Sequence, residues 1–78
     1  MNRIAIIGII VEEYEAAEKV NAVLHDFGSY IVGRMGIPYK DRGVSVISVI
    51  VDAPNDVINL IGGKLGSIKG VSAKTLFK

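Results

Sequence analysis

The sequence predicts an α+β fold: a ferredoxin-like βαββαβ sandwich, in which a four-stranded antiparallel sheet carries two helices on one face. The main observation is that one strand–helix–strand unit occurs twice. In each half, an apolar run is followed by a helical pattern and then by a second apolar stretch. These segments are residues 4–11, 12–27 and 30–39, then 44–51, 54–65 and 70–77. No linker interrupts them, so we expect a single domain over residues 1–78.

Both helical segments carry apolar residues at spacings of three and four, which is typical of a helix with one face on a sheet. In the first segment the stripe is Ala17, Val20, Leu24 and Phe27, flanked by Ala16 and Val23; in the second it is Val57, Leu60, Ile61, Leu65 and Ile68. Glu12, Glu13 and Glu15 are expected in the first helical turn, where the helix dipole favours acidic side chains.

The helix ends are predicted from proline, glycine and capping residues. Pro54 suits the first turn of the second helix, with Asp52 or Asn55 as its cap. Gly28 and Gly66 suit the left-handed position just past each helix end.

A glycine pair, Gly62-Gly63, lies inside the second helical pattern and costs about 1 kcal/mol per glycine relative to alanine. The pair is interpreted either as close packing or as a hinge or a backbone surface that a ligand approaches.

Both faces of the central strands are apolar, although a two-layer fold covers only one of them. In the first strand Ile4, Ile6 and Ile10 oppose Ala5, Ile7, Ile9 and Val11; in the third, Val44, Val46 and Ile50 oppose Ile47, Val49 and Val51. The uncovered face would be a large apolar patch, which usually marks an interface. The sequence therefore predicts a homodimer or homotetramer that associates through its sheets.

Composition and charge exclude several other classes of function. The formal net charge of +1 argues against polyanion binding, and the first and third strands lack the aromatic residues on which RNA-recognition modules stack bases. No direct nucleic-acid binding is expected. The apolar run at residues 4–11 is too short to span a membrane and lacks a cleavage site. With no cysteine and no export signal, the sequence predicts a cytoplasmic protein without membrane contact.

No catalytic constellation is visible, so we expect a protein that is not an enzyme. His25 is the only histidine and there is no cysteine, so neither a transition-metal site nor a bound cofactor is expected. The alternative is a small enzyme of ferredoxin-like fold with an active site at a subunit interface, using Arg34, Tyr39 or His25.

The segment at residues 34–43 joins the second and third strands and holds three basic residues, one acid and one tyrosine. Arg34, Tyr39 and Arg42 are its candidate ligand-binding residues, because arginine forks recognise the carboxylate or phosphate of a small anionic metabolite or a partner protein. The alternatives are a solvated turn that keeps the sheet edge soluble, and an Arg34 that pairs with Glu12 or Asp52 across subunits.

Three stretches carry a resemblance to a known family: residues 32–39 running into 43–48, residues 64–66 followed by 69–71, and the opening residues 7–12. Together they resemble a small bacterial family described as regulators of iron-only hydrogenase systems. The resemblance implies an ACT-like oligomer with paired sheets, similar in fold to the C-terminal domain of the nickel-responsive repressor. It also implies a non-enzymatic regulatory module that senses a small ligand or modulates a partner protein.

Two departures limit what the resemblance implies. The nickel-responsive repressor binds its metal through histidines and a cysteine on strands, and no strand here carries either residue. ACT domains that bind amino acids place a glycine turn after the first strand, where residues 11–14 of this chain read Val-Glu-Glu-Tyr. Nickel sensing therefore does not carry over, and the residues of this turn give no support for amino-acid binding.

Overall fold

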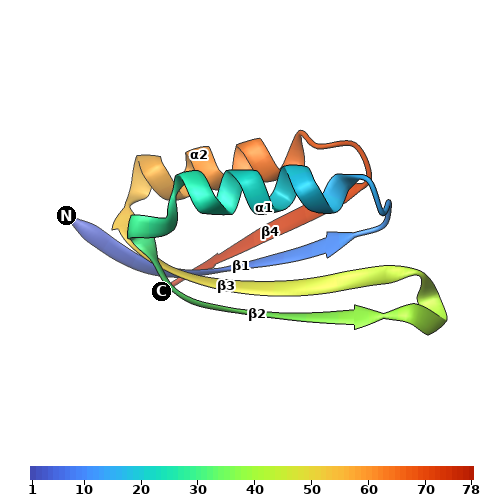
Figure 1. Ribbon diagram of the computed structural model, residues 1–78. Helices are drawn as coiled ribbons and strands as arrows, with labels where there is room; N and C mark the ends of the chain where they lie inside the picture. The colour runs from blue at the N-terminus through green and yellow to red at the C-terminus, as the bar shows by residue number, and fades with distance from the viewer.

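The computed structural model describes all 78 residues and confirms the predicted order of strands and helices. The helices lie on one face of a four-stranded antiparallel sheet, and the other face carries no helix (Figure 1). This arrangement is the predicted ferredoxin-like α+β fold. The elements are β1 (Asn2–Val11), α1 (Ala16–Asp26), the 3₁₀ turn η1 (Gly28–Tyr30), β2 (Ile31–Tyr39), the 3₁₀ turn η2 (Lys40–Arg42), β3 (Val44–Pro54), α2 (Asn55–Gly66) and β4 (Val71–Phe77).

The sheet has the strand order β2-β3-β1-β4, so β1 and β3 form its centre and β2 and β4 its edges. The central strands pair from Asn2 opposite Pro54 to Val11 opposite Ser45. The hairpin of β2 and β3 extends beyond the ends of both helices (Figure 1). As a result, the helix-side face of β2 is left largely uncovered, and its Arg34 is exposed.

The core lies between the sheet and the helices and is entirely apolar. Alternate residues of β1 and β3 point into it, as the sequence pattern predicted, and Ile7 and Ile9 are fully buried. Burial of an isoleucine of this kind contributes about 1.5–3 kcal/mol. The remaining buried residues are Ala5, Val11, Ala16, Val20, Leu24, Ile47, Val49, Val51, Ala53, Ile58, Ile61, Leu65 and Val71.

The buried face of α2 matches the predicted one at Ile61 and Leu65 but not at the other positions. Ile58, Ile61 and Leu65 are fully buried, whereas Leu60 is 49% exposed and Val57 is only half-buried. Ile58 and Ile61 are three residues apart and share a face, but Leu60 lies about 200° around the helix axis from Ile58. In an apolar helix several stripes fit the sequence, and packing on the sheet selects one of them.

The first helix begins four residues later than predicted. The Glu12 N–H donates a hydrogen bond to the Gly70 carbonyl at 2.7 Å, which ties the chain leaving β1 to the turn before β4. A tight turn follows, in which the Ala16 N–H donates to the Glu13 carbonyl at 3.0 Å. Glu12 and Glu13 therefore precede the helix and Glu15 is its N-cap, so the prediction that they form its first turn is wrong.

The left-handed glycines are not the predicted ones. Gly28 and Gly66 have negative φ, while Gly43 and Gly70 have φ of +65° and +82°. Gly28 opens η1 and Gly66 is the last helical residue, so neither helix ends on a left-handed glycine. At Gly70 the absence of a side chain also makes room, because a Cβ there would lie 2.5–2.8 Å from three atoms of Glu13.

No side chain caps the start of α2. Strand β3 runs on to Pro54, so Asp52 is a strand residue rather than a cap. Asn55 uses its Oδ1 atom to accept a hydrogen bond from Arg3 at 2.9 Å. Arg3 also donates to the carbonyl oxygen of Lys78, and so fastens the C-terminal end to the start of α2.

Candidate functional site

The side of the sheet that carries no helix, here called the open face, is apolar, as the sequence predicted. Nine large apolar side chains on it are between 41% and 68% exposed. They come from all four strands, and they are Ile4, Ile6, Ile10, Met35, Ile37, Tyr39, Val46, Ile50 and Leu76.

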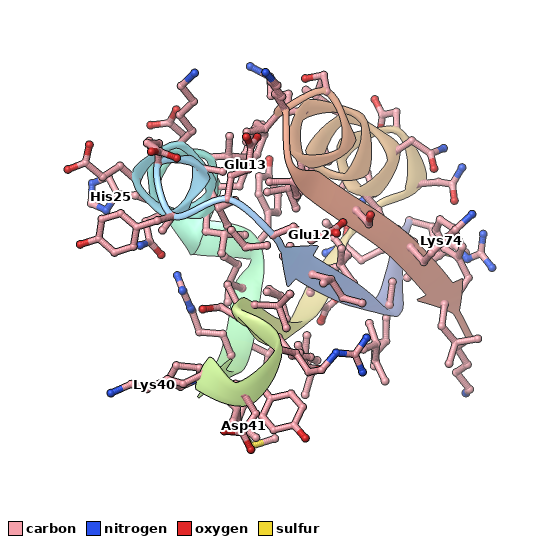
Figure 2. The ribbon with its side chains drawn as sticks, turned by 90° about the vertical axis from the view of Figure 1, so that its right-hand side faces the viewer. Glu12, Glu13, His25, Lys40, Asp41 and Lys74 are labelled. Atoms are coloured by element: carbon pink, nitrogen blue, oxygen red, sulfur yellow. The ribbon has the colours of Figure 1, made fainter.

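The centre of the open face is lined by small residues. Gly8 of β1 lies opposite Ser48 of β3, and these two are flanked by Lys74 of β4 and Met35 of β2. Lys74 lies on the strand farthest from the hairpin (Figure 2). The other apolar side chains of the open face therefore form two groups, on either side of this row of four residues, of which Met35 is itself apolar.

The molecule exposes more surface than its size requires. Its accessible area is 5298 Å², whereas a folded monomer of 8.3 kDa typically exposes about 4,600 Å². The excess of about 700 Å² is close to the area that each partner buries in a standard-sized interface, about 800 Å². The open face and the hairpin that extends beyond the helices both add to this exposed area.

A second feature lies on the opposite side of β2, where the hairpin extends beyond the helices. Between α1 and the helix-side face of the hairpin there are two adjoining cavities of about 410 and 180 Å³. Val11, Ala17, Pro38 and Ser45 line both of them. We call this feature the α1–hairpin groove, and its walls are mainly apolar or small side chains.

Arg34 lies at one end of the α1–hairpin groove. Its Nη2 atom donates a hydrogen bond to Oδ1 of Asn21, on α1, at 2.9 Å. Because this partner is a neutral amide rather than Glu12 or Asp52, the contact orients the guanidinium without neutralising its charge. The opposite end of the groove is lined by Glu13, Tyr14 and Lys40.

The three candidate ligand-binding residues of the hairpin do not gather at one point. Side chains alternate along β2, so Arg34 lies on the helix side, whereas Tyr39 lies on the open face and is 50% exposed. Arg42 belongs to η2, at the tip of the hairpin, and lines neither cavity of the groove. Within one chain, a small molecule bound by Arg34 would not reach Tyr39.

The residues considered for catalysis form no recognisable reactive group. His25 is exposed on α1 and points away from the sheet (Figure 2). No three His, Cys, Asp or Glu side chains lie close enough together to hold a metal ion. Neither helix is long and apolar enough to cross a membrane.

The sequence interpretation placed Ala17 in the stripe that faces the sheet and assigned Asn21 no role. In the structure Ala17 is half-buried and lines the groove, and Asn21 accepts a hydrogen bond from Arg34. The small residues Ala17, Gly36 and Pro38 were a usable signal for a groove, because short side chains leave space between elements. That α1 faces the hairpin across this space, however, is known only from the structure, in which the hairpin extends beyond the helices (Figure 1).

Comparisons with known proteins agree with the fold and identify the family. The family described as "TM1266-like: Iron-only hydrogenase system regulator, putative" matches residues 3–75. The solved structure of the uncharacterized protein TM1266 from Thermotoga maritima has a TM-score of 0.95 and 35% sequence identity, covering 99% of this chain and 98% of that one. A formyltetrahydrofolate deformylase from Pseudomonas putida KT2440 has a TM-score of 0.66 and 13% identity over 94% of this chain and 28% of that one, a likeness of fold alone. No curated protein matches the chain. The chain therefore belongs to the TM1266-like family.

Proposed function

We propose that this protein is a non-enzymatic regulator of an iron-only hydrogenase system and that it works as a homo-oligomer joined through the open face. The observation that carries the proposal is the open face itself, with nine large apolar side chains at 41–68% exposure. Exposed apolar areas of this extent are rare on soluble monomers and mark interaction surfaces. Membership of a family described as regulators supports the functional part.

A second copy of the chain suits the open face better than a strongly charged partner. Within the strands, this face carries one cation, Lys74, and one anion, Asp52, so its formal charge is balanced. A two-fold contact brings the same patch of both copies together, and it therefore requires a patch that is complementary to itself. The excess surface of about 700 Å² also matches one side of a standard interface.

The oligomer is tested by measuring molar mass by light scattering at micromolar concentration. We expect the wild-type chain to show a multiple of 8.3 kDa. Ile6→Lys and Ile50→Lys place a charge on the open face and should shift the mass to that of the monomer. Leu60→Lys is the matched control, because Leu60 is also exposed but lies on α2, away from the open face.

A wild-type mass of 8.3 kDa would contradict the proposal. Dissociation by Leu60→Lys as readily as by Ile6→Lys would also contradict it, because the open face would then have no special role. Circular dichroism of each variant separates dissociation from unfolding.

The regulatory role is tested in a host that makes an iron-only hydrogenase. Hydrogenase activity and transcript levels are compared in strains carrying the wild-type gene, a deletion, Ile6→Lys or Leu60→Lys. We expect Ile6→Lys to behave like the deletion and Leu60→Lys like the wild type. A change in activity without a change in transcript would favour regulation by protein contact, and no change in the deletion strain would contradict the proposed function.

A further inference from the structure

We propose that the α1–hairpin groove binds a small organic carboxylate with a short apolar body. Arg34 would hold the carboxylate, and Ala17 and Pro38 would contact the body. Every residue of the groove comes from one chain, so this inference goes beyond the proposed function and does not depend on the oligomer.

Space in the groove comes from short side chains on facing elements. Ala17 on α1 lies across from Pro38 and Ser45 on the hairpin, and all three line both cavities. At Gly36 a Cβ would already touch Ile47, at 3.6 Å, so a longer residue there would begin to fill the smaller cavity. Arg34 lines the smaller cavity, of about 180 Å³, and only together with the adjoining cavity of about 410 Å³ does the groove reach the range of small-molecule sites, about 300–1,000 Å³.

The charge in the groove favours an anion at one end only. The guanidinium of Arg34 has five N–H donors, and its hydrogen bond to Asn21 fixes the orientation of the remaining donors. A planar fork of this kind binds a carboxylate through two parallel hydrogen bonds. At the other end Glu13 and Lys40 carry opposite charges, so Arg34 supplies the net positive charge of the groove.

The walls of the groove decide between a carboxylate with an apolar body and a simple inorganic anion. Val11, Ala17 and Pro38 are apolar and line the space next to Arg34. These side chains would make apolar contacts with a hydrocarbon chain, which phosphate lacks. A single guanidinium would also neutralise the charge of phosphate only in part. An apolar site with a few convergent polar groups is the usual form of a small-molecule pocket.

The test is a titration of the ¹⁵N-labelled protein followed by two-dimensional NMR, with hexanoate as the probe. Acetate tests the contribution of the body, 1-hexanol that of the charge, and inorganic phosphate that of a simple anion. We expect hexanoate to shift the amide signals of Ala17, Asn21 and Gly36. We expect the other three compounds to bind at least about ten-fold more weakly, because each lacks one of the two recognised parts.

Variants locate the site and separate its two parts. Arg34→Ala should weaken hexanoate binding roughly 10- to 100-fold, the usual scale for loss of a hydrogen bond to a charged group. Ala17→Leu keeps the charge but fills the groove, and it should remove binding of hexanoate. Arg42→Ala is the matched control, because it removes the same charge from the same hairpin outside the groove.

Several results would overturn the inference. These are no shift of groove amides at tens of millimolar hexanoate, equal binding of 1-hexanol or phosphate, or equal weakening by Arg42→Ala and Arg34→Ala. Arg34 and Arg42 are exposed, so both variants should fold, and their own spectra show whether they do. The oligomer is measured separately by light scattering, so failure of this inference is distinguishable from failure of the proposed function.

Discussion

Replacement of Gly70 by alanine should destabilise the protein far more than the same change at Gly43. Both glycines have positive φ, +82° and +65°, which residues with a Cβ adopt only at a cost. The two sites differ in their surroundings. A Cβ at Gly43 would meet nothing within 4 Å, whereas a Cβ at Gly70 would lie 2.5 Å from Oε2, 2.7 Å from Cγ and 2.8 Å from Cβ of Glu13.

The magnitudes follow from these two terms. The left-handed conformation costs an alanine about 1–2 kcal/mol, offset by about 0.4–1 kcal/mol from the less flexible unfolded chain. Gly43→Ala should therefore cost about 1 kcal/mol. Gly70→Ala adds an overlap comparable to overpacking, about 1–3 kcal/mol, for a total of about 2–4 kcal/mol.

The assay is urea unfolding followed by circular dichroism at one fixed protein concentration, since association also affects stability. In the Gly70→Ala background, Glu13→Ala removes two of the three close contacts but keeps the Cβ, so it should restore part of the loss. The coupling between these two changes should be at least about 0.5 kcal/mol. Between Gly43→Ala and Glu13→Ala it should be close to zero. Equal losses at Gly70 and Gly43, or no coupling with Glu13, would refute the reasoning.

Three further predictions concern the helices and the chain ends. Gly63→Ala should raise the free energy of unfolding by up to about 1 kcal/mol, because Gly63 faces open space in a helix. Gly62→Ala should raise it less, because the new Cβ would lie 3.3 Å from a side-chain oxygen of β4. Ile58→Ala should lower the melting temperature much more than Leu60→Ala, because replacing a buried isoleucine by alanine costs about 2–5 kcal/mol of stability. Equal losses would contradict the burial of Ile58 and the exposure of Leu60. Arg3→Ala should speed hydrogen exchange of the Lys78 amide, because it removes the hydrogen bond to the Lys78 carbonyl, which supports the bond from the Lys78 N–H to the Ile4 carbonyl. Unchanged exchange would contradict that role.

The strand pattern allowed the fold and the apolar open face to be predicted from the sequence. Alternation has a period of two, so once Ile7 and Ile9 are assigned to the core, Ile6 and Ile10 must lie on the other face. Charge and glycine patterns predicted the order of the elements correctly, but they predicted the ends of the helices less accurately. The start of α1 depends on the hydrogen bond from Glu12 to Gly70, a contact across the whole chain that no local pattern contains.

The candidate site was harder to predict for a related reason. Arg34 and Tyr39 are close in sequence and were grouped by their chemistry, but they are five positions apart, and an odd separation places two residues of a strand on opposite faces. Counting alternate positions from Arg34 would have shown this. The partner of Arg34 on α1, Asn21, could not be found by counting, because it depends on how the helix lies across the hairpin.

The two surfaces described here share one edge strand. β2 presents Met35 and Ile37 to the open face, and Arg34 and Gly36 to the α1–hairpin groove. It is paired on one side only, by β3, and its helix-side face is largely uncovered. A carboxylate in the groove and a second copy on the open face would therefore contact opposite sides of the same strand. If either event shifts β2, thermodynamic linkage requires that each changes the affinity of the other by the same factor. A small edge strand would then be sufficient to connect a ligand signal to the assembly of a regulator.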